Sequence, residues 1–338
     1  MNRGRYKKIV AITTGDPAGI GPEITLKAIK HLIETGKFDH SNFIIVGNRD
    51  SLFALNDKFS ILCELDKINI AGAGGPPARQ FTTGEASRES GAASYSYIEK
   101  AVGIVMSGAA SALVTAPISK EALKLAGINY SGHTEILQAL SGSEKVEMAF
   151  HGKYFNLLLL SRHLSLRDAI SRLDINMVAL GILNGARFMR SLFPKASAVD
   201  IIVPGLNPHA SENGLFGDEE EKIIVPAILR AREIVAREAG GAAHVGIYGP
   251  ESADTAFYRA YKSRRKTLLI SFYHDQGLIP FKLLHFDSGV NVTIGLPFVR
   301  TSPDHGTAFQ IAGKNCASAL SMINALGLAF KLKPFELF

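Results

Sequence analysis

KIVAITTGDPAGIGPEI, residues 8–24, is the stretch that decides the fold. Its short apolar strand IVAIT is broken at once by the turn residues GDP at 15–17, and a helix is expected to open at Pro22. Strands that alternate with amphipathic helices predict an α/β fold with mostly parallel sheets. The alternation continues through predicted strands at 43–47 and 112–116 and predicted helices at about 86–106 and 119–125.

The middle of the chain has a different pattern. KVEMAF at 145–150 and YFNLLLLS at 154–161 are separated by the short loop HGK, which predicts an antiparallel hairpin. A second lobe is therefore expected to begin near Tyr130. Long helical patterns then cover 175–192 and 218–238, followed by a strand at 267–273 and a closing helix near 317–328.

The composition is that of a globular protein. At 338 residues, 46% hydrophobic and 20% charged, the chain can form two lobes with their own cores. A net charge of +6 suits anionic ligands, although the basic residues are scattered. No basic face with interleaved aromatic residues is visible, so a nucleic-acid partner is not expected.

The N-terminus and the cysteines bear on the compartment. MNRGRYKK is basic, but only a short strand follows it, so no signal peptide is expected. Apolar runs such as FNLLLL fall far short of the ~20 residues that span a bilayer, so no membrane partner is expected. Cys63 and Cys316 are too few for a disulfide framework, which favours a cytoplasmic location.

Three histidines lie in unusual polar and glycine-rich runs: His163 in SRHLSLRD, His209 in GLNPHASENGLFGDEE and His274 in SFYHDQGLIPFK. Any one alone could be an ordinary surface or core histidine. Their wide spacing does not fit a compact structural zinc motif, so a shared ion would have to be assembled by the fold. Three ligands leave a position open for substrate, which predicts a catalytic divalent cation. Zinc suits three imidazoles best, with magnesium or cobalt as alternatives.

Six motifs in order resemble one family of enzymes. The chain resembles the 4-hydroxythreonine-4-phosphate dehydrogenases of pyridoxine biosynthesis, including relatives that act on 4-phospho-threonate or erythronate. The motifs are GDPAGIGPEI at 15–24, VTAPISK at 114–120, SGHTE at 131–135, NPHASENGLFGDEE at 207–220, YHDQGLIPFK at 273–282 and GVNVTIGLPFVRTSPDHGTAFQIAG at 289–313.

The first and last of these motifs also resemble segments of the isocitrate and isopropylmalate dehydrogenases. That resemblance implies an isocitrate/isopropylmalate dehydrogenase-like fold, with two α/β lobes around a central cleft. It also implies that NAD or NADP binds without a GxGxxG fingerprint, and a glycine-rich turn without a ligand is the alternative for each segment. The implied cofactor-binding residues are Gly15, Asp16, Gly19, His305, Gly306 and Thr307.

The resemblance implies a domain division and a homodimer. Residues 1–130 with 272–338 are expected to form the nucleotide-side lobe, and 131–271 a central lobe with the metal ligands and the dimer interface. The LLLL run at 157–160 is apolar on both faces of a strand and needs cover on both sides. A partner subunit could provide that cover, and the family's active site is shared between two chains.

The substrate phosphate is assigned to His133 and Thr134, because SGHTE immediately precedes an apolar helical run. A competing interpretation makes Thr134 a plain helix cap with Glu135 in the first turn. By resemblance, Lys282, Asn291 and Arg300 occupy the remaining substrate-binding positions.

The implied reaction is oxidation of a secondary alcohol. The ion is expected to lower the pKa of the alcohol while a nicotinamide accepts hydride, and the resulting 2-amino-3-oxo acid loses carbon dioxide to give 3-amino-2-oxopropyl phosphate. Lys282 could stabilise the enolate-like charge. The catalytic candidates are thus Lys282, Asp254 and Asp275, and the general base remains open between the two carboxylates. Asp275 could instead orient His274.

One departure from the family pattern concerns the substrate. Arg162 stands where a small Thr or Ser usually precedes the first ligand, and Ser165 replaces a proline. Arg162 could face solvent or meet a carboxylate. A metal-dependent hydrolase or isomerase of phosphorylated sugars is a rival function that needs no nucleotide, and HGTAFQIAG argues against it. A non-catalytic binding protein is a third, weaker hypothesis.

Overall fold

The computed structural model describes residues 8–73, 81–238, 244–335 and 337, so the basic run at 1–7 lies outside the described residues. The chain forms two compact units. Unit 1 comprises residues 1–146 and 296–334, and unit 2 comprises residues 147–295 and 335–338. Among the described helices, none combines the length and the apolar character that crossing a membrane requires.

Unit 1 is built on a parallel sheet in the order β3-β2-β1-β4-β11. Its central strands are buried along their whole length, as parallel strands covered on both faces should be. The strands are β1 (Val10–Thr13), β2 (Phe43–Val46), β3 (Asn69–Ala71), β4 (Ala112–Thr115) and β11 (Val299–Pro303).

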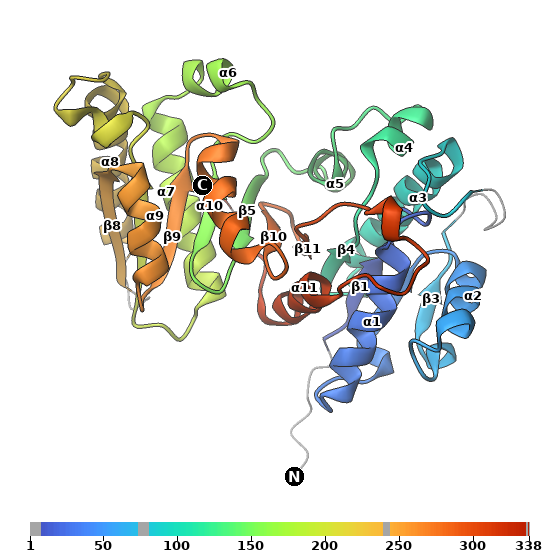
Figure 1. Cartoon of the computed structure of the whole chain (residues 1–338). Coiled ribbons are helices and arrows are strands. Elements are labelled where there is room, and N and C mark those ends of the chain that lie inside the picture. The colour runs from blue at the N-terminus through green and yellow to red at the C-terminus, as the bar shows by residue number, and fades with distance from the viewer. Residues whose placement is uncertain (1–7, 74–80, 239–243, 336, 338) are drawn as a thin grey trace, which may run out of the picture. The chain divides into compact units, whose positions relative to one another are not determined.

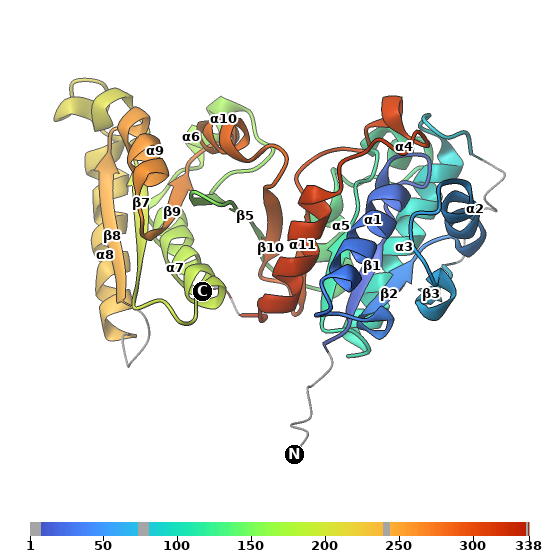
Figure 2. The same cartoon turned by 60° about the horizontal axis from the view of Figure 1, so that its bottom comes forward.

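The helices of unit 1 confirm the predicted alternation. The long helix α3 packs on the sheet together with α4 and α5, and α1 and α11 lie side by side in both views (Figures 1 and 2). The helices are α1 (Gly21–Glu34), α2 (Arg49–Phe59), α3 (Arg88–Met106), α4 (Lys120–Leu125), α5 (His133–Ser141) and α11 (Leu320–Lys331).

Unit 2 has a mixed sheet in the order β10-β5-β6-β9-β7-β8. β10, β5 and β6 pair antiparallel, whereas β6, β9, β7 and β8 run parallel. The strands are β5 (Glu147–His151), β6 (Asn156–Leu159), β7 (Ala198–Pro204), β8 (His244–Glu251), β9 (Lys266–Ser271) and β10 (Val290–Ile294).

The helices of unit 2 pack around this sheet. α7 lies against α8, and α10 contributes Leu278 and Phe281 to a core with Phe150, Phe155 and Leu157. The helices are α6 (Leu166–Ser171), α7 (Ile175–Leu192), α8 (Val225–Arg237), α9 (Ala253–Lys262) and α10 (His274–His285).

The unit boundaries lie further along the chain than the predicted lobe boundaries. Residues 131–146 belong to unit 1, because α5 packs against α3. Residues 272–295 belong to unit 2, because α10 packs on β6 and β9 and β10 pairs with β5. One boundary therefore follows the packing of α5, and the other follows the packing of α10 and the pairing of β10.

The predicted hairpin is confirmed as β5 and β6, but its leucines are covered within the single chain, contrary to the expectation that a partner covers them. Leu157, Leu158 and Leu159 are at most 1% exposed within the single chain. Leu157 and Leu159 face the core that includes Phe281, and Leu158 lies near Gly181 of α7. Leu157, Leu158 and Leu159 thus need no cover from a partner subunit, and Leu160 is partly buried.

Two predicted helices begin later than the sequence pattern suggests. The pattern at 218–238 divides into a π turn, Glu220–Ile224, and α8. The closing helix starts at Leu320, because the backbone N–H and carbonyl of Ala317 bond to Glu23 and Lys27 of α1 instead. The predicted helix at 175–192 is confirmed at both ends as α7.

Candidate active site

Two segments assigned to the nucleotide meet in unit 1. The backbone N–H of Ile20 donates to the carbonyl of Thr307 at 3.0 Å, and a Cβ on Gly19 would lie 2.9 Å from the same oxygen. Gly15 has φ +69°, and a Cβ there would lie 2.2 Å from the Pro117 carbonyl. Only glycine allows both approaches.

Asp16 is wholly buried in this loop. Its carboxylate accepts hydrogen bonds from the Ala18 N–H at 2.9 Å and from the Ser90 hydroxyl at 3.3 Å. Burial raises the pKa of Asp16, against the effect of these hydrogen bonds. These bonds give the Asp16 carboxylate a role in holding the turn. His305 is partly buried and Gly306 is exposed, so both are more exposed to solvent than Asp16.

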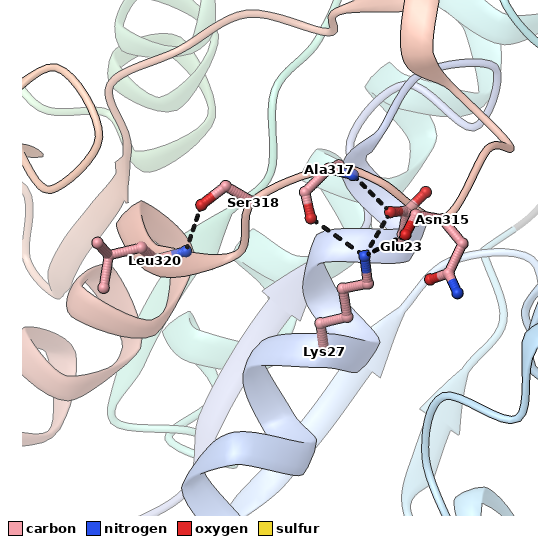
Figure 3. Close-up of polar contacts among 6 residues, drawn as sticks. All are labelled: Glu23, Lys27, Asn315, Ala317, Ser318 and Leu320. Atoms are coloured by element: carbon pink, nitrogen blue, oxygen red, sulfur yellow. Dashed lines mark hydrogen bonds and ion pairs between the residues drawn. The ribbon is translucent and has the colours of Figure 1, made fainter.

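An ion pair between the partly buried Lys27 and the buried Glu23 fastens the end of the same region to α1 (Figure 3). Glu23 accepts from Lys27 Nζ at 2.7 Å and from the Ala317 N–H at 2.9 Å. Lys27 also donates to the carbonyls of Asn315 at 3.0 Å and Ala317 at 3.1 Å. α1, which follows the glycine loop at 15–21, thus holds residues 315–317, just after the segment HGTAFQIAG.

His133 and Thr134 begin α5 in unit 1. The N-cap position is Gly132, and no side chain caps this helix end, so the interpretation of Thr134 as a cap is wrong. Thr134 is buried, and His133 Nε2 is buried without a hydrogen-bond partner among the described residues. The first backbone N–H groups of α5 carry the positive end of the helix dipole, so the helix end and His133 together suit an anion.

Arg300 belongs to the same unit, on β11, and its side chain is buried. Its Nη2 donates to Thr115 Oγ1 at 2.6 Å across the β4–β11 pair. Burial lowers the pKa of Arg300 to about 9, and Glu135 acts in the opposite direction, so the side chain is a cation at neutral pH. Burial, and then the charge of Arg300, hold the pKa of His133 well below its usual range. His133 is therefore a neutral donor or acceptor beside a cation.

The three candidate metal ligands follow neighbouring parallel strands of unit 2. His163 follows β6, His274 follows β9 and His209 follows β7, and the order β6-β9-β7 delivers all three at one edge of the sheet. The ring centroids of His163 and His274 are 6.1 Å apart. His274 Nδ1 lies 2.6 Å from Asp275 Oδ1, which leaves Nε2 as the nitrogen available to a cation.

His209 does not join this pair within one chain. Among the described residues, no three His, Cys, Asp or Glu side chains are placed so that one metal ion could bind them all. The imidazole of His209 lies instead beside the ring of Phe216, with centroids 6.2 Å apart. The donor chemistry of three imidazoles still suits a cation such as zinc.

The loop that carries His209 has a rare backbone conformation. His209, Ala210, Ser211, Glu212 and Asn213 all have positive φ, between 46° and 65°. Left-handed backbone costs non-glycine residues roughly 1–2 kcal/mol each, so the surrounding structure must hold it.

The remaining catalytic candidates have distinct surroundings. Asp254, at the start of α9, accepts from Ser252 Oγ at 2.7 Å and from the Thr255 N–H at 2.8 Å, and these bonds lower its pKa. A lowered pKa makes a carboxylate a weaker base. Lys282 lies on α10, as His274 does, and Asn291 lies on β10 of unit 2. Arg162 precedes His163, and its Nη1 is buried without a partner among the described residues.

Sequence reasoning missed two side chains that support this site. Gln276, two residues after His274, donates to the Gly205 carbonyl at 2.8 Å. Glu220, at the end of the motif that carries His209, accepts backbone N–H groups at 206 and 207. Both residues lie inside the quoted motifs, which is the only signal that could have found them.

Comparison with known proteins places these observations in one family. The family profile described as pyridoxal phosphate biosynthetic protein PdxA matches residues 25–329. A 4-hydroxythreonine-4-phosphate dehydrogenase of Desulfosudis oleivorans is 38% identical over 96% of this chain and 95% of its own length. A D-threonate 4-phosphate dehydrogenase of Salmonella typhimurium is also 38% identical, over 96% of this chain and 99% of its own.

Solved structures agree with these matches. The crystal structure of 4-hydroxythreonine-4-phosphate dehydrogenase from Klebsiella pneumoniae superposes with a TM-score of 0.79 at 33% identity, covering 96% of this chain and 98% of that one. Isocitrate dehydrogenase from Methylococcus capsulatus, at 16% identity and a TM-score of 0.50 over 96% of this chain and 85% of that one, shares the fold alone. The predicted fold class and the family resemblance are confirmed, and the chain belongs to the PdxA family of pyridoxal phosphate biosynthetic proteins.

Proposed function

We propose that this protein oxidises 4-hydroxythreonine 4-phosphate at its secondary alcohol, using NAD or NADP and one divalent cation. The 2-amino-3-oxo acid would then lose carbon dioxide to give 3-amino-2-oxopropyl phosphate, a step of pyridoxal phosphate biosynthesis. The observation that carries the proposal is the 38–40% identity, over 96% of the chain, to curated dehydrogenases of that name. A cytoplasmic location belongs to the same proposal.

The substrate phosphate is assigned to the start of α5 and to Arg300. A buried cation, a neutral imidazole and free helix N–H groups together satisfy a phosphate through charge-assisted hydrogen bonds. Binding energy gained at the phosphate, remote from the reacting carbon, can serve to position the alcohol.

In the chemical step, a bound nicotinamide supplies the hydride acceptor and a bound cation supplies Lewis acidity. Asp275 holds His274 in the tautomer that carries its proton on Nδ1. Lys282 provides positive charge for the enolate-like electron density that develops as carbon dioxide leaves. Asp254 and Asp275 stay the two candidates for accepting the alcohol proton.

A homodimer with shared sites completes the proposal. The pair formed by His163 and His274 lacks His209 within one chain, so a second chain would have to supply the third ligand. α10 and the residue that follows it also expose apolar side chains, with Ile279 66%, Leu283 83% and Phe286 63% exposed. Their i, i+4, i+7 spacing forms one apolar stripe, which is the kind of surface that a partner covers.

A second substrate is favoured by Arg162. A guanidinium nitrogen that is buried without a protein partner calls for an anion, and the substrate carboxylate would provide one. A 4-phospho-D-threonate or erythronate lacks the α-ammonium group that Arg162 would repel. This is the activity that the name of the Salmonella typhimurium relative describes.

A substrate panel tests both candidates. The purified protein is assayed for NADH or NADPH formation with 4-hydroxythreonine 4-phosphate, 4-phospho-D-threonate and 4-phospho-D-erythronate, with and without a chelator. The largest kcat/KM identifies the substrate, and loss of turnover on chelation confirms the cation. Calorimetry with NAD separates a dehydrogenase from a phosphosugar hydrolase or isomerase, because only a dehydrogenase needs the nucleotide.

A further inference from the structure

The left-handed run at 209–213 begins immediately after a segment that is fixed by one carboxylate. Glu220 is 3% exposed, so its charge is almost wholly removed from solvent. Its Oε1 accepts the backbone N–H groups of Leu206 and Asn207, both at 2.8 Å. Its Oε2 accepts from the Asn207 side-chain amide at 2.9 Å. Three N–H groups at two consecutive residues therefore converge on one side chain.

The position of Glu220 on its own helix makes this reach possible. Glu220 is the first residue of the π turn Glu220–Ile224, which precedes α8. Single π turns are rare within helices and recur at functional sites. Here the π turn follows the loop. Glu220 lies 14 and 13 positions after Leu206 and Asn207, and its side chain accepts their backbone N–H groups. The Glu220 carboxylate thus joins the two ends of the loop that carries His209.

We propose that Glu220 is a positioning residue for His209. Its carboxylate fixes the backbone at 206–207. The left-handed run that follows then holds the His209 imidazole in one orientation. Without the carboxylate, these N–H groups lose their buried acceptor and the loop can relax toward ordinary backbone angles. The inference rests on the proposed function to the extent that it assigns His209 to a cation.

Two substitutions separate the effect of the negative charge of Glu220 from the effect of its side-chain length. Glu220→Asp keeps the charge but is one methylene too short to hold both N–H groups. Glu220→Gln keeps the length but places an amide NH₂ against the donor amide of Asn207. The matched controls are Glu221→Asp and Glu221→Gln, because Glu221 is the next residue and its side chain is exposed.

The readout is Co²⁺ binding by the full-length protein, measured by calorimetry and by the visible absorption of the bound ion. We expect both Glu220 variants to weaken Co²⁺ binding roughly 10- to 100-fold and to shift the absorption band, as removal of a residue that orients a ligand does. NAD affinity should stay within about twofold, since the loop lies in unit 2. The Glu221 variants should match the wild type.

Unchanged Co²⁺ affinity and spectrum in both Glu220 variants would overturn the inference, as would a wild-type protein that binds no Co²⁺. If the Glu220 variants do not fold, Asn207→Leu decides the matter. That change removes the amide donor to Glu220 Oε2, together with its 2.7 Å bond to Glu219 Oε2, and leaves both backbone bonds to Glu220 Oε1 in place. It must produce a smaller loss in the same direction. Failure of the proposed function is seen separately, as absence of NADH formation with every phosphorylated acid.

Discussion

The side-chain amide of Gln276 donates a 2.8 Å hydrogen bond to the backbone carbonyl of Gly205. At its other end, Gln276 Oε1 accepts the Phe272 N–H at 2.8 Å. One side chain thus joins the end of β9, which leads to His274, to the segment that leads to His209. The relative placement of two candidate ligand loops depends on this link.

Replacing Gln276 with Leu should lower kcat/KM roughly 10- to 100-fold, because supporting residues of metal ligands carry effects of that size. The fold should survive, since one polar side chain at a loop is lost. Steady-state kinetics and a thermal melt measure the two effects. A variant with wild-type kcat/KM would show that the link does not matter for turnover.

Replacing Glu23 with Ala should destabilise unit 1 by roughly 1–3 kcal/mol, because Lys27 and the Ala317 N–H lose a buried charged partner. We also expect a higher KM for the nucleotide, since residues 315–317 follow the segment assigned to it. Urea unfolding and NAD kinetics are the measurements. Glu34→Ala, an exposed change on the same helix, is the control and should alter neither.

Replacing Arg162 with Thr should lower kcat/KM for 4-phospho-D-threonate roughly 10- to 100-fold, the size of one lost charge-assisted hydrogen bond. The loss for 4-hydroxythreonine 4-phosphate should be smaller, because its ammonium group is no longer repelled. The ratio of the two kcat/KM values is the readout, and Arg167→Thr, at an exposed site on α6, is the control. An unchanged ratio would place Arg162 away from the substrate.

His285 should make stability depend on acid pH. Its Nε2 accepts the Tyr154 N–H and its Nδ1 donates to the Phe281 carbonyl, both at 3.1 Å. Burial lowers the pKa of His285 from 6.5 to about 4. The unfolded chain therefore takes up a proton as the pH falls below about 6.5, whereas the folded chain does not until about pH 4, so folding free energy is lost across that window.

The expected loss reaches about 3 kcal/mol at full effect. Urea unfolding of the wild type and of His285→Gln at pH 7.5, 5.5 and 4.5 measures it. The stability difference between the two proteins should shrink toward pH 4.5. A difference that is constant with pH would mean that His285 does not titrate in this way.

Mixing His209→Ala with His274→Ala should restore activity. Each homodimer lacks a ligand in both sites, but a hybrid would contain one site with intact His163 and His274 from one chain and intact His209 from the other. We expect up to about half the activity per hybrid. The matching mixture of His163→Ala with His274→Ala should stay inactive, since these two residues lie together in one chain. Equal recovery in both mixtures, with hybrids confirmed by native mass spectrometry, would contradict this arrangement.

The sequence predicts most of the fold, because hydrophobic periodicity is local. The hairpin and the helix Ile175–Leu192 follow directly from that periodicity. The start of α11 does not, since the Glu23–Ala317 bond joins residues 294 positions apart. The cover over Leu157–Leu159 likewise comes from distant helices.

The candidate metal ligands could be found from their motifs. The contacts that hold the ligand loops in place could not. Ala210, Ser211 and Glu212 have no preference for positive φ, so no local pattern predicts the left-handed run. His209 and Asn213, at the two ends of the run, are the residue types that are enriched in this conformation. The run exists because Glu220 and the surrounding loop hold it, and those contacts appear only after the chain has folded.

The division of the chain sets an order for its synthesis. Unit 2 is almost wholly one continuous segment, 147–295, whereas unit 1 needs residues 296–334 to add β11 and α11. On the ribosome, the first 146 residues therefore emerge long before their last strand, and the β4 edge stays unpaired while the whole of 147–295 is translated. An open parallel edge in a nascent chain is a template for wrong pairing. Chaperone demand during translation should thus concentrate on the N-terminal segment, and premature termination before β11 should yield an insoluble fragment.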